Sequence, residues 1–245
     1  MLIIIEIIII SMENKKEKEK EKEKYLISDD SLKKSYVVSS LILFGSSFIT
    51  LIEALKTDSV RARHILNLET VVSIIAGYVY LKFVEIIEKK ELTKETHKEI
   101  VQYRYIDWFI TTPLLILALI CFFTYYDKNP LNFKYYLLAI GFNFLMLYEG
   151  YLGETGSIDK MEGFYMGFMG YIGMMLTIWC YYVHKQERYH QKIIFFVFAI
   201  IWSFYGIAYL LDDRTKNLIY NILDVFSKTM FGLFMWLYYG NVVSF

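Results

Sequence analysis

The chain has 245 residues, of which 56% are hydrophobic and 18% aromatic, and its 26 basic residues balance its 26 acidic residues. Its mean hydropathy of +0.36 is too high for an ordinary soluble domain. A net charge of zero provides no global attraction for nucleic acid. The apolar runs are continuous rather than alternating, which excludes a transmembrane β-barrel. The composition predicts an all-α integral membrane protein, with the lipid bilayer as its partner and no nucleic-acid partner.

Residues 1–31 differ from the rest of the chain. Residues 1–10 are apolar, but this run is about half as long as a membrane span requires, and it lacks the basic start of a signal peptide. Residues 15–24 alternate lysine and glutamate without an apolar face, which is typical of a solvated helix or a disordered segment. We expect residues 1–31 to be a flexible tail and residues 32–245 to form the membrane domain.

Seven apolar spans follow in order. They cover residues 32–55, 65–88, 100–124, 132–152, 162–184, 191–211 and 217–240. Each has about 20 residues or more, enough to cross a hydrocarbon core of roughly 30 Å at about 1.5 Å per residue. Short connections predict that consecutive helices are neighbours in space. The connection at 85–99 is longer, with room for a short hairpin or a helical extension.

The charges of the connections predict how the bundle is oriented. Three connections on one side are net positive, and their basic residues are Lys56, Arg61, Arg63, Lys128, Lys134, Lys185, Arg188 and Lys192. Two connections on the other side carry the acidic residues Glu154, Asp159, Glu162, Asp212 and Asp213. Basic connections tend to stay in the cytoplasm. We therefore expect an external amino terminus and a cytoplasmic carboxyl terminus.

Two of the spans contain charged residues at membrane depth. In the third span, Arg104, Asp107 and Thr111 are three and four residues apart and fall on one helical face. In the last span, Asp224 and Lys228 are four residues apart near the middle of the helix. A charge at this depth costs a few kcal/mol even on lenient scales, so such residues usually serve a function.

A meeting of these two faces would place two carboxylates, a guanidinium and an amine in one nearly neutral cluster, which makes buried charge tolerable. The alternative is four separate side chains that reach for the membrane surface. Aromatic residues accompany the charges, either as plain core packing or as a flat apolar slot beside the amine; they are Trp108, Trp202, Tyr205 and Tyr209. A buried lysine can form a Schiff base with an aldehyde.

Three motifs resemble those of one family. Residues 104–115 read Arg-Tyr-Ile-Asp-Trp-Phe-Ile-Thr-Thr-Pro-Leu-Leu, and residues 217–221 read Asn-Leu-Ile-Tyr-Asn, followed by Asp224, Lys228 and Phe-Gly-Leu at 231–233. Residues 151–156 read Tyr-Leu-Gly-Glu-Thr-Gly. These motifs resemble microbial (type 1) rhodopsins, proteorhodopsins in particular, and the resemblance covers residues 32–240. It implies a seven-helix bundle that encloses all-trans retinal.

The resemblance also implies roles for individual residues. Lys228 would bind retinal as a protonated Schiff base, Asp107 would be its primary counterion and proton acceptor, and Asp224 would be the second counterion. Arg104 would lie on the outward proton path, and Thr111 would hydrogen-bond Asp107. The residues expected to line the retinal are Tyr105, Trp108, Thr112, Leu115, Met146, Gly150, Trp202, Tyr205 and Tyr209. Leu115 is similar to the residue of green-absorbing members.

Three positions depart from the family pattern. Outward pumps usually carry a carboxylate donor seven residues after the Thr111 position, where this chain has Ala118. Gly206 stands where the sixth helix usually has a proline, and the histidine partner of the counterion is replaced by an apolar or aromatic residue near 80–81. The sequence therefore leaves the source of a proton from the cytoplasmic side open.

Glu69, near the cytoplasmic end of the second span, is the candidate for that donor. Glu53 and Arg63, with Trp236, are expected to form a second polar cluster at the same end. This pattern resembles the second group of viral rhodopsins of large DNA viruses, which implies a homo-oligomer, a pentamer, with a donor-like glutamate on the second helix. The alternative is that Glu69 is a solvated interfacial carboxylate and that Glu53 and Arg63 form a salt bridge near a loop.

The sequence thus predicts a transporter rather than an enzyme, with no metal site. The favoured function is a light-driven outward proton pump. A light-gated ion channel is the first alternative, because Ala118 and the polar cytoplasmic end permit a hydrated path. A photosensor that acts through a separate partner is the second. A chloride pump is disfavoured, because Asp107 keeps the position that chloride would occupy negatively charged.

Overall fold

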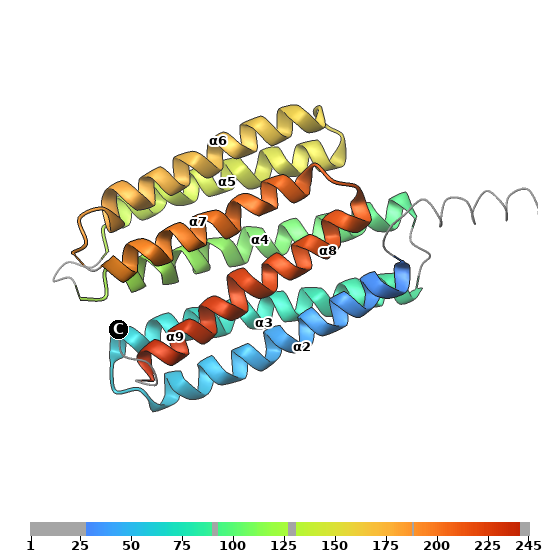
Figure 1. Ribbon diagram of the computed structural model, residues 1–245. Coiled ribbons are helices and arrows are strands. Elements are labelled where there is room, and N and C mark those ends of the chain that lie inside the picture. Colours follow the sequence, from blue (N-terminus) through green and yellow to red (C-terminus); the bar gives the residue numbers. More distant parts are fainter. Residues whose placement is uncertain (1–27, 90–92, 127–130, 188, 241–245) are drawn as a thin grey trace, which may run out of the picture.

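The computed structural model describes residues 28–89, 93–126, 131–187 and 189–240. The predicted tail up to residue 27, and Lys128 and Arg188, lie outside these residues. The described chain forms seven helical rods that run side by side, alternately up and down (Figure 1). The rods are α2 (Asp29–Lys56), α3 (Val60–Lys89), α4 (Lys94–Phe123), α5 (Phe133–Thr155), α6 (Lys160–Ile178) continued by η1 (Trp179–Val183), α7 (Tyr189–Tyr209), and α8 (Asp213–Asp224) continued by η2 (Val225–Met230) and α9 (Phe231–Tyr239). The predicted all-α seven-helix bundle is confirmed.

The rods coincide with the seven predicted spans. The largest differences are at the starts of α3, at Val60 rather than 65, and of α4, at Lys94 rather than 100. The connection at 85–99 is therefore mostly a helical extension, because α3 continues to Lys89 before α4 begins. Thr93 caps the start of α4 by accepting a hydrogen bond from the backbone N–H of Thr96.

Six of the rods, within the described residues, are long and apolar enough to cross a membrane. The exception, α5, has 23 residues but carries the buried Asn143 and several tyrosines. Large apolar side chains such as Leu41, Phe48 and Ile207 lie exposed on the outside of the bundle. A surface of this kind needs lipid around it, which fits an integral multi-pass membrane protein.

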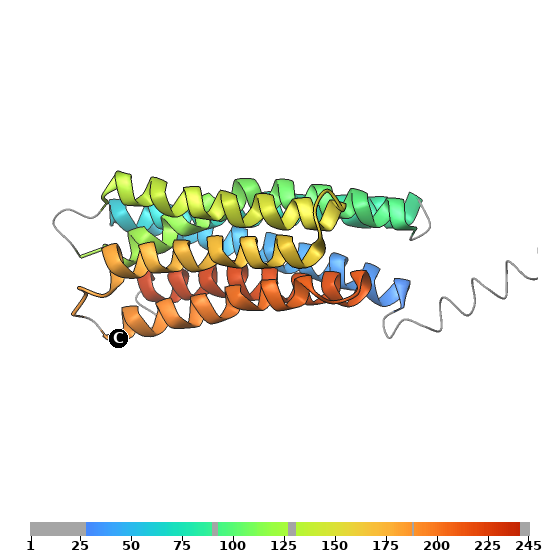
Figure 2. The ribbon, with the colours of Figure 1, turned by 90° about the horizontal axis from the view of Figure 1, so that it is seen from above.

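A close seam of the bundle joins α5 and α6, which lie together at one edge (Figures 1 and 2). A Cβ at Gly170 would come within 2.7 Å of the backbone nitrogen of Met146, and one at Gly163 within 2.8 Å of the backbone oxygen of Glu149. Only glycine allows this approach, in the way that small residues bring membrane helices together. This close packing sets the position of α5 residues that face the interior of the bundle, such as Met146 and Gly150.

The last rod changes its winding where it carries Lys228. Residues Val225–Met230 form a π-helical turn between α8 and α9. Such turns are rare and are often found at functional sites. By contrast, α4 is one continuous helix although it contains Pro113. The two rods that bear the predicted charged residues therefore meet at a locally widened turn.

Candidate functional site

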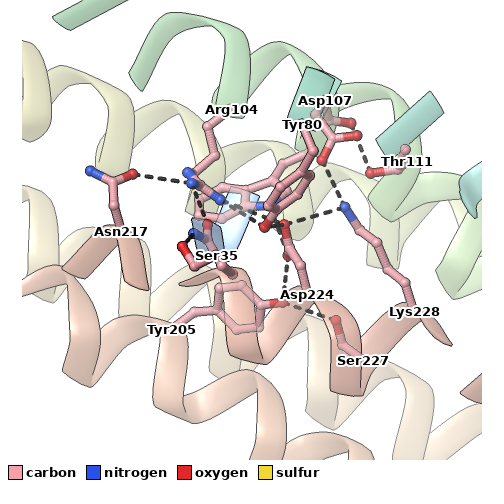
Figure 3. Close-up of polar contacts among 12 residues, drawn as sticks. Ser35, Tyr80, Arg104, Asp107, Thr111, Tyr205, Asn217, Asp224, Ser227 and Lys228 are labelled. Atoms are coloured by element: carbon pink, nitrogen blue, oxygen red, sulfur yellow. Dashed lines mark hydrogen bonds and ion pairs between the residues drawn. The ribbon is translucent and has the colours of Figure 1, made fainter. Parts of the chain in front are cut away.

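The centre of the site is an ion pair between Lys228 of η2 and Asp107 of α4. Lys228 Nζ lies 2.7 Å from Asp107 Oδ2, and both residues are almost completely buried, at 2% and 1% exposed. They are 121 positions apart in the sequence, and the crossing of the two rods brings them together (Figure 3). The arrangement differs from isolated side chains that reach for the membrane surface, because each charge has its partner inside the bundle.

Asp224 is the second carboxylate, one helical turn before Lys228. It accepts hydrogen bonds from the hydroxyls of Tyr205 at 2.7 Å and Tyr80 at 2.8 Å, and from the indole N–H of Trp108 at 3.3 Å (Figure 3). Its Oδ2 atom lies 3.7 Å from Lys228 Nζ. Three donors and a nearby cation thus give both oxygens of this buried carboxylate a partner.

Arg104 completes the cluster on the side away from Lys228. Its NH1 atom lies 3.6 Å from Asp224 Oδ2 and donates to the hydroxyl of Tyr80 at 3.2 Å. Its NH2 atom donates to the side-chain oxygens of Asn217 at 3.1 Å and Asn221 at 2.9 Å. The guanidinium is 2% exposed, and two cations and two carboxylates give the cluster no net charge.

The two carboxylates are not equivalent. Asp224 has donors on both oxygens, whereas Asp107 Oδ1 is buried with no hydrogen-bond partner among the described residues. The predicted bond from Thr111 is present but ends on the backbone oxygen of Asp107, at 2.8 Å, rather than on its carboxylate (Figure 3). Asp107 therefore keeps a free acceptor oxygen directly beside Lys228.

A cavity opens from Lys228 between α4, α5, α6 and α7. All nine residues expected to line a cofactor, in addition to Lys228, are on its wall: Tyr105, Trp108, Thr112, Leu115, Met146, Gly150, Trp202, Tyr205 and Tyr209. Other residues line it that were not expected to do so, among them Phe164, Phe168, Tyr171, Gly206 and Tyr220. A Cβ at Gly150 would lie 2.8 Å from the Tyr105 hydroxyl, so this wall has no room for a larger residue.

The cavity fits a flat apolar molecule that ends in a carbonyl group. Aromatic side chains dominate its wall, and the lysine amine at its end is the group that forms a Schiff base with an aldehyde. Asp107, at 2.7 Å from the amine, would balance the positive charge of a protonated nitrogen. Lys228 would hold such a cofactor covalently, and the aromatic wall would hold it by contact.

Glu69 of α3 lies in the interior rather than at a solvated interface. It is 0% exposed, and neither carboxyl oxygen has a hydrogen-bond partner among the described residues. A Cβ added at Gly232 of α9 would meet Ser46 Oγ at 3.3 Å and Glu69 Oε2 at 3.5 Å. The hydroxyls of Ser46, Ser73 and Thr229 are also buried without a partner in this part of the chain. Buried polar atoms of this kind are normally satisfied by water.

The predicted cluster of Glu53, Arg63 and Trp236 does not form an ion pair. Arg63 donates instead to the backbone oxygens of Ala54 at 3.2 Å and Thr57 at 2.7 Å, at the end of α2. Within the described residues, no ion pair links Arg63 to Glu53. The last carbonyls of a helix lack partners inside it and carry partial negative charge, so they attract the guanidinium. The alternative of a salt bridge near a loop is wrong for the same reason.

Several residues of the site were not identified from the sequence. Tyr80 was noted only as a replacement for a family histidine, yet it bonds both Asp224 and Arg104. Ser227 contacts the Tyr205 hydroxyl at 2.9 Å, and Asn221 donates to Ser35 Oγ at 2.7 Å. Polar residues on the inner faces of apolar spans were the available signal. Their partners depend on the rotation of each helix, which a single sequence does not reveal.

Comparisons with known proteins agree with this arrangement. The family model of the bacteriorhodopsin-like proteins matches residues 31–242. The green-light absorbing proteorhodopsin of Gamma-proteobacterium EBAC31A08 is 28% identical over 149 residues, 55% of this chain and 59% of that protein. The blue-light absorbing proteorhodopsin of Gamma-proteobacterium Hot 75m4 is 26% identical over 217 residues, 80% of this chain and 82% of that protein. The chain thus spans about three fifths of the green-absorbing relative.

Solved structures share the whole bundle. The crystal structure of viral rhodopsin OLPVRII has a TM-score of 0.80 and 32% sequence identity, and the match covers 87% of this chain and 99% of that one. The blue light-absorbing proteorhodopsin from Med12 has a TM-score of 0.69 at 21% identity, with the same coverage of 87% and 99%. The second likeness is one of fold.

Proposed function

The chain belongs to the bacteriorhodopsin-like family of microbial rhodopsins, close to the viral ones, and on this premise we propose that it is a light-driven outward proton pump. Members of this family bind retinal, and all-trans retinal on Lys228 is the resting cofactor of this proposal. The observation that carries it is the asymmetry of the two carboxylates: Asp107, at 2.7 Å from Lys228, has a free oxygen, whereas Asp224 has none.

Lys228 would hold retinal covalently, and the bound group would supply light absorption and isomerisation, which would change the direction and acidity of the N–H group on the lysine nitrogen. Asp107 then accepts that proton, since it is the adjacent carboxylate with an unused oxygen. Asp224 is the poorer acceptor, because Tyr80, Tyr205 and Trp108 already donate to its two oxygens. The Trp108 and Trp202 side chains in the cavity wall keep the cofactor in place.

Arg104 sets the outward direction. Its guanidinium lies 3.6 Å from Asp224 and holds Asn217 and Asn221 toward the end of the bundle where α8 begins. Loss of negative charge at Asp107 weakens the hold of the central cluster on the guanidinium, which favours release of a proton on that side. By the charge of its connections, that side is the external one, with the amino terminus outside and the carboxyl terminus cytoplasmic.

Glu69 is the proposed donor from the cytoplasmic side. Its complete burial without a partner makes an ionised carboxylate costly there, so the group carries a proton in the resting state. The buried hydroxyls of Ser73 and Thr229 provide positions for water on the way to Lys228. Glu53 and Arg63 have no place in this transfer, because Arg63 is bound to the end of α2. The working unit is a homo-oligomer, a pentamer by resemblance to the viral group.

Light-induced pH change in a cell suspension tests the proposal. Illumination should acidify the medium, and a protonophore should abolish the effect. A change that persists with the protonophore, or no change at all from a protein that has formed its pigment, contradicts the proposal.

A light-gated ion channel is the second candidate, favoured by the unpartnered polar atoms around Glu69. Patch-clamp recording separates the two, since a channel current reverses with voltage while a pump current stays outward. A photosensor would instead require a separate partner, and a photocycle that recovers in milliseconds counts against it.

A further inference from the structure

A second buried ion pair lies at the end of the bundle where α8 begins. Lys216, in the first turns of α8, is 1% exposed, and its amine contacts Glu154 Oε2 at 2.5 Å and Asp213 Oδ1 at 2.8 Å. The Glu154 side chain, at the end of α5, is 5% exposed, whereas that of Asp213 is 52% exposed. Lys216 thus bridges two rods and joins a buried carboxylate to one that faces water.

This ion pair borders the central site. Tyr220 follows Lys216 by four residues on α8, and Gly150 precedes Glu154 by four residues on α5. Both Tyr220 and Gly150 are in the cavity wall. One helical turn of about 5.4 Å therefore separates the pair from the cavity. A second link runs from Arg104 to Asn217 at 3.1 Å, and from the Asn217 amide to the backbone oxygen of Asp213 at 2.7 Å. Polar contacts are continuous from Lys228 to this end of the bundle.

The charges of the three residues suit the uptake of one proton. Two carboxylates and one amine leave a net charge of −1, and Glu154 Oε1 is buried with no hydrogen-bond partner among the described residues. If Glu154 gains a proton, Lys216 remains paired with Asp213. No unpaired buried charge is created, which is the costly outcome in a low-dielectric interior.

We propose that Lys216, Glu154 and Asp213 form the exit station of the proton path. Glu154 takes up the proton at Oε1 as the central cluster releases it, and passes it to the water that Asp213 reaches. Lys216 is a positioning residue, which holds Glu154 ionised in the dark and stays on Asp213 while Glu154 is neutral. The inference rests on the outward transport proposed above.

The test uses the full chain with retinal in liposomes, a pH-sensitive dye in the external medium, and flash excitation. In the Glu154→Gln variant, deprotonation of the lysine nitrogen should keep its rate, while the appearance of the proton in the medium should be delayed roughly tenfold or more. Lys216→Gln should delay it in the same direction, and Lys216→Arg, which keeps the charge, should restore the timing. Light-minus-dark infrared spectra should contain a carboxyl band of Glu154 that Glu154→Gln removes.

Glu162→Gln is the matched control, since Glu162 is an exposed carboxylate at the same end of the bundle. Wild-type release timing and an unchanged carboxyl spectrum in Glu154→Gln would overturn the exit station while leaving the pump intact. If Glu154→Gln does not form the pigment, wild-type timing in Lys216→Gln overturns it equally. Absence of any outward proton from the wild-type protein removes both the exit station and the proposed function.

Discussion

Tyr80 and Asp224, which are 144 positions apart in the sequence, share a buried hydrogen bond of 2.8 Å. The same hydroxyl accepts a bond of 3.2 Å from Arg104. The Tyr80 hydroxyl therefore links the Arg104 guanidinium to the Asp224 carboxylate. It occupies an acceptor position of Asp224, which makes that carboxylate a poorer proton acceptor. In the proposed mechanism, the preference of the proton for Asp107 depends on this occupation of Asp224.

Tyr80→Phe removes that hydroxyl and leaves Asp224 with one donor fewer. Asp224 should then compete with Asp107 for the proton, and outward transport should fall by roughly tenfold, since a hydrogen bond to a charged group contributes about 1.5–3 kcal/mol. Initial rates of light-induced acidification measure the effect. Tyr78→Phe is the control, because Tyr78 is an exposed tyrosine on the same helix. Equal rates in the two variants would deny Tyr80 this role.

Asp107→Asn removes the negative charge nearest to Lys228. Transport should fall by on the order of 100-fold or more, the usual contribution of a positioned proton-transfer group. The absorption maximum should move to longer wavelength, because the anion no longer stabilises the positive charge on the lysine nitrogen in the ground state. Glu85→Gln, at a surface ion pair with Lys82 and Lys89, should change neither quantity. A pigment of unaltered colour in Asp107→Asn would exclude Asp107 as the counterion.

Gly232→Ala tests the space beside Glu69. The new methyl group would lie 3.3 Å from Ser46 Oγ and 3.5 Å from Glu69 Oε2, where water is expected. Reprotonation of the lysine nitrogen should slow by roughly tenfold, a barrier increase of about 1.4 kcal/mol, and Glu69→Gln should slow it further. Gly45→Ala adds the same methyl group where nothing lies within 4 Å. Flash spectroscopy that finds unchanged reprotonation in Glu69→Gln would remove Glu69 from the mechanism.

The environment of Asp212 predicts how the stability of the fold changes in acid. Burial raises its pKa, but the hydrogen bonds from Thr215 and Arg214 outweigh this effect and hold the pKa of Asp212 below its usual 3.8. A lowered pKa stabilises the fold above about pH 4, and this contribution is lost as the pH falls through the folded value. Asp212→Ala should also cost about 1 kcal/mol through loss of the cap of α8.

Thermal unfolding of the detergent-solubilised protein between pH 2 and pH 6, on the order of the range over which carboxylates titrate, measures this effect. Asp212→Asn retains a capping side chain but does not titrate. Its midpoint should depend less on pH than that of the wild type, and an identical pH profile would contradict the assignment to Asp212.

The sequence predicted the seven rods; it left the meeting of the two charged faces as one of two possibilities, and the family resemblance implied the pairing of Asp107 with Lys228. Apolar length and the spacing of charges along one helix are local properties, and buried charges must find partners. The partners of Tyr80 and Arg63 were beyond its reach. They depend on how neighbouring rods are rotated and on which backbone carbonyls are left unbonded at the end of α2.

The same limit applies to the end of the bundle where α8 begins. Lys216 and Glu154 are 62 positions apart, and the sequence assigned Glu154 only to an acidic connection. Their contact joins α8 to the end of α5, and it depends on how these two rods are placed and on the reach of a lysine side chain. The interior position of Glu69 on α3 likewise depends on the packing of α2 and α9 around it, which a single sequence does not reveal.

The π-helical turn at Val225–Met230 has a consequence for how the chain tolerates change in length. It contains one residue more than an α-helix would use, and each residue of an α-helix turns the chain by about 100°. Because the wide turn takes up that residue within a single turn, α8 and α9 keep the phase of an uninterrupted α-helix. Deletion of one residue there should restore ordinary winding and leave both Asp224 beside Arg104 and Gly232 beside Glu69. Deletion of one residue from the α-helical part of the same rod would instead rotate everything after it by about 100°. The π-turn is therefore the position at which the last rod can lose a residue without turning its two ends against each other.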